Sequence, residues 1–266
     1  MENRKPFDWI NDESITFLRR GYLSEGEEPI ERIRVIANHA EKLLGKVGFA
    51  DKFYEYMSKG WYSLSSPVWA NFGKKRGLPV SCFGSNIGDN IESILFTQSE
   101  VGEMSKMGGG TSGYFGNLRG RGAEITDNGH APGAVHFMNL FQSVVDNISQ
   151  GSTRRGRFSP YLPIEHPDIM EFLEIGTEGA TIQDLTHAVT VTDEFMESMI
   201  AGDKDKRAAW AKVIQRRGEI GYPYIMFHDT MNKNTVDVYK DKGAKLQRAL
   251  INYFIDKNTD AGYKEV

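Results

Sequence analysis

The sequence predicts an α/β protein in which residues 1–65 form a helical region and residues 66–243 form a domain of alternating strands and helices. Between Pro29 and Leu44, apolar residues recur at spacings of three and four, which is typical of an amphipathic helix that begins at a proline. From Ser66 onward, glycine-rich turns separate short apolar segments, as they do in α/β domains.

Strands and helices are expected to alternate in this second part. The expected strands are 113–118, 157–164, 187–192 and 224–228. The expected helices are 93–107, 132–149, 167–175, 193–200 and 206–217. One face of the 132–149 helix is strongly apolar and consists of Phe137, Phe141, Val144, Val145 and Ile148. Such a face usually belongs to the core, and a helix-bundle contact between subunits is the alternative.

Composition and charge restrict the class of protein. The 266 residues suffice for a large core, and 39% hydrophobic with 26% charged residues is ordinary for a globular chain. A net charge of −4 gives no general attraction to nucleic acid or to an anionic membrane. The first residues lack the apolar core of a signal peptide, and no apolar run reaches membrane-spanning length. We therefore expect a soluble, intracellular protein without nucleic-acid or membrane partners.

Cys82, in the stretch GLPVSCFGSNIGDN, is the only cysteine. A single cysteine excludes an internal disulfide and fits a reducing compartment. The usual fate of such a residue is burial as a small hydrophobe, whereas a partly exposed thiol can be oxidised and then reduced again by exchange.

Glycines and arginines indicate a site for an anion. Consecutive glycines in KMGGGTSG at 106–113 would let backbone N–H groups approach a phosphate, but the segment lacks the ending of a Walker A loop, and the glycines alone favour a helix stop with a tight turn. Arg119 and Arg121 follow the next predicted strand, and a second cluster contains Arg154, Arg155 and Arg157. Arginine forks bind phosphate oxygens bidentately, and Asp89 and Asn90 are candidates for the sugar or base of a nucleotide.

Seven motifs, read in order, resemble the large catalytic subunit of class I ribonucleotide reductase. They are SLSSPVWAN, GLPVSC, GDNIESI, KMGGGTSGYFGNLRGRGAEI, SQGSTRRGRFSPYLPIEHPDIMEFL, GYPYIMFHDTMN and NTVDVYKDKG. The resemblance runs from about residue 10 to Gly243. It implies a ten-stranded α/β barrel of two five-stranded halves behind a helical region, of which this chain supplies the helical region and the first barrel half. The nucleotide-binding cone that many relatives carry at the N-terminus is not expected here.

The resemblance also implies roles for individual residues. Cys82 matches one of two thiols that deliver electrons to the ribose. Ser66 and Ser81 match substrate contacts, mainly to the diphosphate, and Gly110 matches a glycine beside the substrate. The specificity site, for a deoxynucleoside triphosphate or ATP, is matched by Asp89, Asn90, Ile91 and Arg119, with Arg121 as a further phosphate contact. The loop that relays effector identity to the substrate is matched by Gln150, Gly151, Ser152, Thr153, Arg154 and Arg155.

Partners follow from the same resemblance. Helices 93–107 and 132–149 resemble the pair that forms the four-helix bundle of a homodimer. A separate metal-containing small subunit supplies the radical, and thioredoxin or glutaredoxin reduces the enzyme. We expect no metal or cofactor on this chain, and a cytoplasmic location in a bacterium, or in the host of a phage that encodes the protein. The acidic residues Glu165, Asp168, Glu171 and Glu174 are expected at a solvated helix start, and His166 in a packing or capping role.

The resemblance ends before the family's radical-bearing cysteine. That residue lies in a motif like NLCSE, and the family also uses a second redox thiol and a C-terminal cysteine pair, none of which this sequence contains. Residues 244–266 do not match the family, but their apolar residues have helical spacing. We hypothesise a divided enzyme in which a second polypeptide supplies the missing cysteines and the tail helps to dock it. The alternatives are part of an adenosylcobalamin-dependent reductase, a non-catalytic nucleotide-binding regulator, and an engineered truncation.

Overall fold

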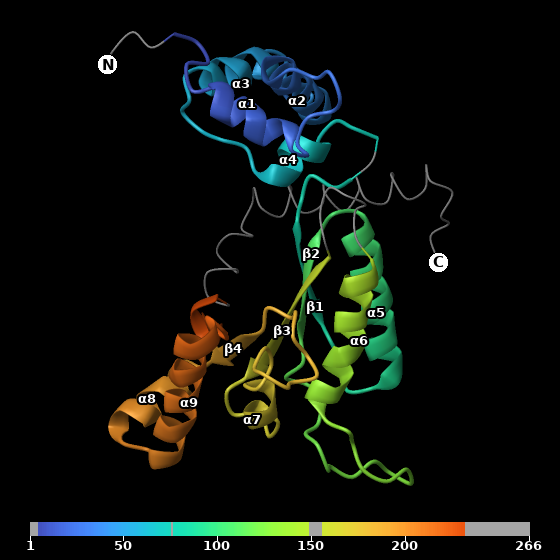
Figure 1. Cartoon of the computed structure of the whole chain (residues 1–266), viewed down its shortest axis with the longest axis vertical. Coiled ribbons are helices and arrows are strands. Elements are labelled where there is room, and N and C mark those ends of the chain that lie inside the picture. Colours follow the sequence, from blue (N-terminus) through green and yellow to red (C-terminus); the bar gives the residue numbers. More distant parts are fainter. Residues whose placement is uncertain (1–4, 76, 149–155, 232–266) are drawn as a thin grey trace. The chain divides into compact units, whose positions relative to one another are not determined.

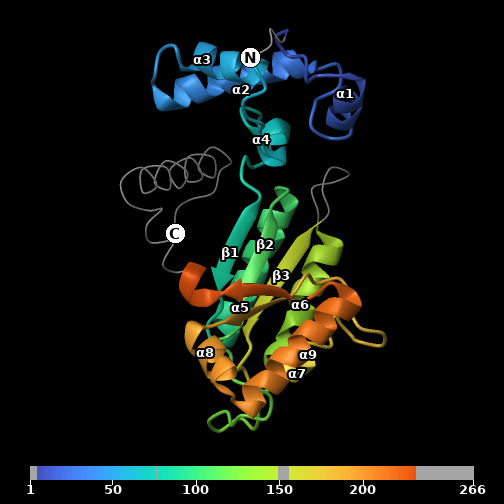
Figure 2. The ribbon, with the colours of Figure 1, turned by 90° about the vertical axis from the view of Figure 1, so that its left-hand side faces the viewer.

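The computed structural model describes residues 5–75, 77–148 and 156–231. The chain forms two compact units (Figures 1 and 2). The first runs to residue 162 and includes 166–187, and the second contains 163–165 together with the described residues from 188.

The first unit begins with four helices. They are α1 (Asp12–Arg19), α2 (Pro29–Leu44), α3 (Phe49–Ser58) and α4 (Ser66–Asn71). Pro29 occupies the first turn of α2, and Gly45 ends the helix in the left-handed conformation with φ 62°. This confirms the helix predicted between these two punctuating residues, since proline suits a helix start and glycine a left-handed cap.

A shared apolar core holds these helices together. Its buried residues are Leu18, Ile33, Ile36, Met57 and Trp69, surrounded by partly buried aromatic rings. Trp69 belongs to α4, so the helical core continues beyond residue 65.

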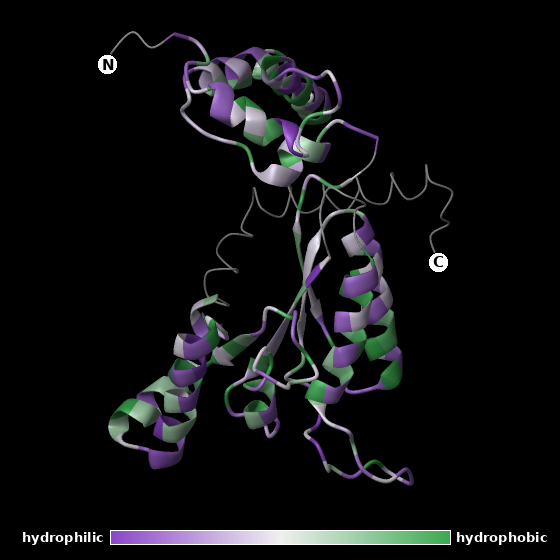
Figure 3. Ribbon diagram, viewed as in Figure 1, coloured by the Kyte–Doolittle hydropathy of each residue, from purple (hydrophilic) through white to green (hydrophobic). Residues whose placement is uncertain are grey.

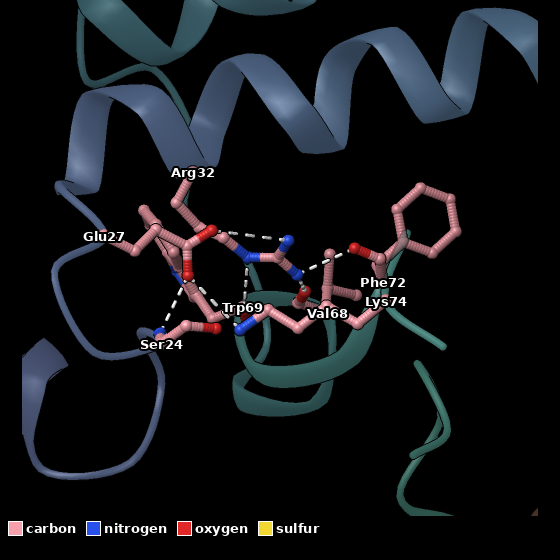
Figure 4. A network of polar contacts seen from close by, with 7 residues as sticks. All are labelled: Ser24, Glu27, Arg32, Val68, Trp69, Phe72 and Lys74. Carbon is pink, nitrogen blue, oxygen red and sulfur yellow. Dashed lines mark hydrogen bonds and ion pairs between the residues drawn. The ribbon is translucent and has the colours of Figure 1, made fainter. Parts of the chain in front are cut away.

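A buried arginine joins α2 to the end of α4 (Figure 4). The Arg32 side chain is fully buried, and its Nε donates to the Trp69 carbonyl at 2.7 Å. Its Nη2 donates to the carbonyls of Phe72, at 2.7 Å, and Val68, at 3.2 Å. The guanidinium therefore binds the carbonyls at the C-terminus of the short helix, where backbone partners run out, and adds a second bond to Val68, whose carbonyl also accepts the Phe72 N–H. Burial lowers the pKa of Arg32, and Glu27, whose Oε1 lies 3.9 Å from Nη1, partly opposes this.

The rest of the first unit is a parallel sheet with helical crossovers. Strands β1 (Cys82–Asn86), β2 (Gly110–Tyr114) and β3 (Arg157–Pro163) pair in that order. Helices α5 (Ile91–Lys106) and α6 (Ala134–Asn147) connect them and lie side by side (Figure 1). The helices predicted at 93–107 and 132–149 are thus confirmed within the described residues.

The prediction of a strand at 113–118 was wrong, because the strand starts at Gly110 and ends at Tyr114. Side chains occupy the space beside Gly113 in β2 and beside Gly109, which lies just before β2. A Cβ on Gly113 would lie 2.8 Å from the Phe158 ring and 2.9 Å from Ile87 Cδ1, and one on Gly109 would lie 2.7 Å from the Phe83 ring. Close packing, rather than a phosphate, therefore explains these two glycines.

The second unit contains a parallel pair of strands, β4 (Ala188–Val191) and β5 (Tyr224–Phe227). Helices α8 (Asp193–Ala201) and α9 (Lys204–Ile220) connect them (Figure 2). Thr192 caps α8 and Asp203 caps α9 through side-chain oxygens that accept backbone N–H bonds. In the first unit, α7 (Ile169–Phe172) is shorter than the predicted 167–175, because the chain turns at Leu173 and continues in tight turns.

Candidate functional site

Cys82 lies exposed at the first residue of β1, next to two other predicted substrate contacts. Its Sγ is 3.7 Å from the Ser81 hydroxyl, and the Gly110 N–H donates to the Ser81 carbonyl at 2.5 Å. In the sheet, Cys82 is the partner of Gly110, which in turn is the partner of Arg157. The structure therefore brings Ser81, Cys82 and Gly110 together at the amino end of the parallel strands, where the thiol is accessible for exchange.

The residues predicted to bind an effector gather beyond the other end of β1. Asn90 caps α5, its side-chain oxygen accepting the Ser93 N–H at 2.7 Å. Asp89 accepts two bonds from Arg119, one from Nε at 2.7 Å and one from the backbone N–H at 3.2 Å. Ile91 is the first residue of α5 and is 50% exposed. A helix N-terminus beside an arginine favours an anion, while carboxylate and amide oxygens accept bonds from hydroxyl groups.

The two clusters are well separated along the chain. Asp89 follows Cys82 by seven residues, the first four of which belong to β1. At a rise of about 3.3 Å per residue, the four steps from Cys82 to Asn86 alone span about 13 Å. Any influence of one cluster on the other must therefore be transmitted through the fold or through another chain.

Arg121 does not join Asp89 and Arg119. Its guanidinium forms a two-pronged pair with Glu171, Nε to Oε2 at 2.9 Å and Nη2 to Oε1 at 2.6 Å. These hydrogen bonds and the nearby charge of Glu171 raise the pKa of Arg121. The expectation of a solvated acidic surface was wrong for Asp168, which is buried, whereas Glu171 is exposed and forms a surface pair with Arg121.

The remaining predicted site residues are placed only in part. Ser66 is half-buried at the first residue of α4. The loop residues Gln150, Gly151, Ser152, Thr153, Arg154 and Arg155 lie outside the described residues. Of the two residues that flank the undescribed segment, Gly156 packs tightly, since a Cβ there would lie 2.5 Å from the Ile148 carbonyl oxygen. The next residue, Arg157, pairs with Gly110, so β3 begins at the same end of the sheet as Cys82.

Sequence reasoning missed Asn117, which fastens the effector end of β1. Its Nδ2 donates to Asn86 Oδ1 at 2.7 Å and to the Ile87 carbonyl at 3.0 Å. The available signal was its position, because Asn117 lies two residues before Arg119 in the turn that follows β2.

Within residues 5–75, 77–148 and 156–231, no three His, Cys, Asp or Glu side chains are grouped so that they could hold a metal ion. In the same part of the chain, every helix is too short or too polar to cross a membrane.

A helical region, followed by a parallel βαβαβ unit with an exposed thiol at one end and a helix start beside an arginine at the other, defines an α/β protein with a helical N-terminal region. Comparison with protein families gives the identity. Residues 9–77 match the family described as "Ribonucleotide reductase, all-alpha domain", and residues 80–206 match "Ribonucleotide reductase, barrel domain". The chain belongs to the ribonucleotide reductase large-subunit family, which confirms the resemblance found in the sequence and the expected fold, with its first barrel half.

Individual relatives agree with this assignment. The solved α subunit of the class Id ribonucleotide reductase of Actinobacillus ureae is 53% identical, with a TM-score of 0.82 over 90% of this chain and 44% of that one. The putative ribonucleoside-diphosphate reductase large subunit of Frog virus 3 is 31% identical over 76% of this chain and 38% of its own length. A vitamin B12-dependent ribonucleoside-diphosphate reductase of Thermoplasma acidophilum is 31% identical over 70% of this chain and 26% of its length. The chain thus spans less than half the length of these relatives.

Proposed function

We propose that this chain supplies the substrate-phosphate contacts, one redox thiol and the specificity site of a ribonucleoside-diphosphate reductase, which converts ribonucleotides to deoxyribonucleotides by radical chemistry. The observation that carries the proposal is the grouping of Ser81, Cys82 and Gly110 at the amino end of β1 and β2 in a chain of this family. Ser66 and Ser81 would hold the diphosphate, with Gly110 beside the substrate.

The role of Cys82 follows from the electron balance. Replacing the ribose 2′-hydroxyl by hydrogen, with loss of water, is a two-electron reduction. Two thiols must therefore become one disulfide in each turnover, and a reductant such as thioredoxin or glutaredoxin must restore them. Cys82 supplies one of these thiols, and its exposure allows a second sulfur to reach it.

The second thiol and the radical-bearing cysteine must come from outside these 266 residues, because Cys82 is the only cysteine among them. We propose that a complementary polypeptide carries both and that a separate metal-containing small subunit generates the radical. The tail at 244–266, proposed to help dock that polypeptide, lies outside the described residues. The proposed location is the cytoplasm of a bacterium, or of the host of a phage that encodes the protein.

The effector proposal rests on the second cluster. A deoxynucleoside triphosphate or ATP would place its phosphates near Arg119 and the start of α5, and its sugar or base near Asp89 and Asn90. The segment from Gln150 to Arg155 would relay the identity of the effector to the substrate.

Homodimerisation through α5 and α6 is supported by an exposed apolar patch on the first half of α5. Ile91, Leu95 and Phe96 are 50%, 48% and 66% exposed, and this end of α5 is strongly hydrophobic (Figure 3). The Phe141 and Val145 part of the α6 face is buried, so it belongs to the core.

The experiment is a tagged purification of this chain from its native source, followed by an activity assay of the purified assembly with Cys82→Ser and, as control, Ser85→Ala on the same strand. We expect a co-purifying polypeptide with an NLCSE-like motif, and deoxyribonucleotide formation that Cys82→Ser abolishes and Ser85→Ala retains. A single larger chain that carries both cysteine motifs would refute the divided enzyme and leave the role of Cys82 intact.

Two alternative functions make different predictions for the same assembly. A regulator that binds nucleotides without catalysis would need the effector cluster and not Cys82, so full activity of the Cys82→Ser assembly would establish it. The likeness to the Thermoplasma relative keeps adenosylcobalamin dependence as the second alternative. Activity that requires added adenosylcobalamin and no small subunit would select it.

A further inference from the structure

The loop that carries Arg119 runs from β2 to α6 and projects beyond the N-terminal end of α6 (Figure 1). Its outer part is a small hairpin. The Gly122 N–H donates to the Ala131 carbonyl at 2.9 Å, and the Ala131 N–H donates to the Ala123 carbonyl at 2.8 Å. We call the residues at its base, 118–121 and 133–134, the loop neck.

One buried carboxylate joins the two sides of the loop neck. Asp168 is 5% exposed, and its Oδ1 accepts the Arg121 N–H at 2.8 Å while its Oδ2 accepts the Ala134 N–H at 2.7 Å. Both bonds are charge-assisted and both are made to backbone, so they fix the path of the chain rather than a side chain. The second bond also satisfies an N–H at the start of α6, where a negative charge is favourable.

His166 completes the attachment and has a defined tautomer. Its Nδ1 accepts the Asp168 N–H at 3.0 Å, so this nitrogen carries no proton. The neutral ring then has its proton on Nε2, which donates to the Leu118 carbonyl at 2.8 Å. The ring is 7% exposed. Through these two bonds it links Leu118, at the start of the loop neck, to the backbone of Asp168, whose carboxylate joins the two sides of the neck.

Two glycines allow this close approach. A Cβ on Gly120 would lie 2.6 Å from Pro167 Cβ, and one on Gly133 would lie 2.8 Å from Asp168 Oδ2. Gly133 also has φ +93°, which disfavours any other residue. The segment 166–168 and the loop neck are thus shaped for each other.

Arg119 lies between the two anchored residues Leu118 and Arg121. Its side chain reaches Asp89 at 2.7 Å, and its Nη1 donates to the Glu124 carbonyl at 3.0 Å. We propose that Asp168, held by His166, is a positioning residue for the effector site, acting through the loop-neck backbone to hold Arg119 beside Asp89 and the start of α5. This inference rests on the proposed function, because it deepens the role assigned to that cluster.

The test uses the native assembly with Asp168→Asn, and Glu165→Gln as the control. Glu165 is three residues earlier and exposed, and it pairs with Lys206 within the second unit. Binding of dTTP and of ATP is measured by calorimetry, and turnover is measured with and without dTTP. The side-chain oxygen of asparagine can still accept one of the two backbone N–H bonds. Its NH2 group then faces the other backbone N–H, and two donors cannot form a hydrogen bond. We expect the Kd for both nucleotides to rise about tenfold or more, the loss typical of one hydrogen bond to a charged group, with unstimulated turnover unchanged.

A double-mutant cycle separates positioning from general damage. If Asp168 acts through Arg119, Asp168→Asn adds little to the Kd in an Arg119→Ala background. Additive effects, or an unchanged Kd in folded Asp168→Asn, would overturn the inference. If Asp168→Asn does not fold, His166→Gln replaces it, since glutamine keeps a donor for Leu118, and an unchanged Kd there has the same meaning. A wild-type assembly that binds neither nucleotide would refute the proposed effector site itself.

Discussion

The buried network around Arg32 gives the sharpest prediction about stability (Figure 4). Arg32→Ala removes three hydrogen bonds from a charged donor to the carbonyls at the end of α4. Removing one side of a buried charged network typically costs about 3–5 kcal/mol, because its partners stay buried without replacement. We therefore expect the free energy of unfolding of the helical region to fall by about 3–5 kcal/mol.

The geometry also predicts the outcome of a conservative change. Arg32→Lys keeps the charge but not the planar fork, so an ammonium cannot serve all three carbonyls, and we expect a loss of about 2 kcal/mol. Urea unfolding followed by tryptophan fluorescence is suitable, because Trp69 is buried and its carbonyl accepts the Arg32 Nε–H. The control is Arg19→Ala, whose exposed pair with Glu28 should contribute less than about 1 kcal/mol. An Arg32→Ala variant as stable as Arg19→Ala would refute the reasoning.

Two further predictions concern the core. Burial lowers the pKa of His187 from 6.5 to about 4. Between these two pH values the imidazole binds a proton in the unfolded chain but stays neutral in the folded one. Stability should fall as pH drops from 6.5 toward 4, by on the order of 3 kcal/mol, and His187→Leu should remove that dependence in thermal melts at pH 7 and 5. Gly113→Ala should destabilise by about 1–3 kcal/mol, since its Cβ would meet Phe158 and Ile87. Gly218→Ala, an open position in α9, is its control, and equal melting temperatures would contradict the predicted clash.

The long helices could be predicted because their signals are local. Proline at the start and glycine at the end define α2, and apolar spacing defines α5 and α6. The first two strands could not be placed in this way. β1 and β2 have the sequences CFGSN and GTSGY, with no alternation of apolar residues, and Gly113 of β2 is required by the side chain of Phe158, 45 positions away.

The residues of the candidate site could be predicted where they belong to a sequence motif, but not where only the folded chain brings them to their partners. Asp89, Asn90 and Arg119 were identified from motifs, and the structure brings them together. Asp168 was misjudged because its partners are the backbone N–H groups of Arg121 and Ala134, 47 and 34 positions away. A backbone partner leaves no pattern of residue types, so only the folded chain can show that this carboxylate is buried and bonded.

The arrangement of α5 and α6 restricts how an effector could act on the thiol. The two helices run in the same direction, since Gln98 contacts Leu140 and Gly102 lies against Val144 and Ile148. Both start at the effector end of the sheet and run back toward the Cys82 end, α6 over about 21 Å for its 14 residues. The residues flanking the proposed relay segment therefore lie a helix length from Asp89 of the same chain. Under the proposed function, direct contact between effector and relay segment would require a second copy packed in the opposite direction, and the exposed Ile91, Leu95 and Phe96 on α5 would offer it an apolar surface.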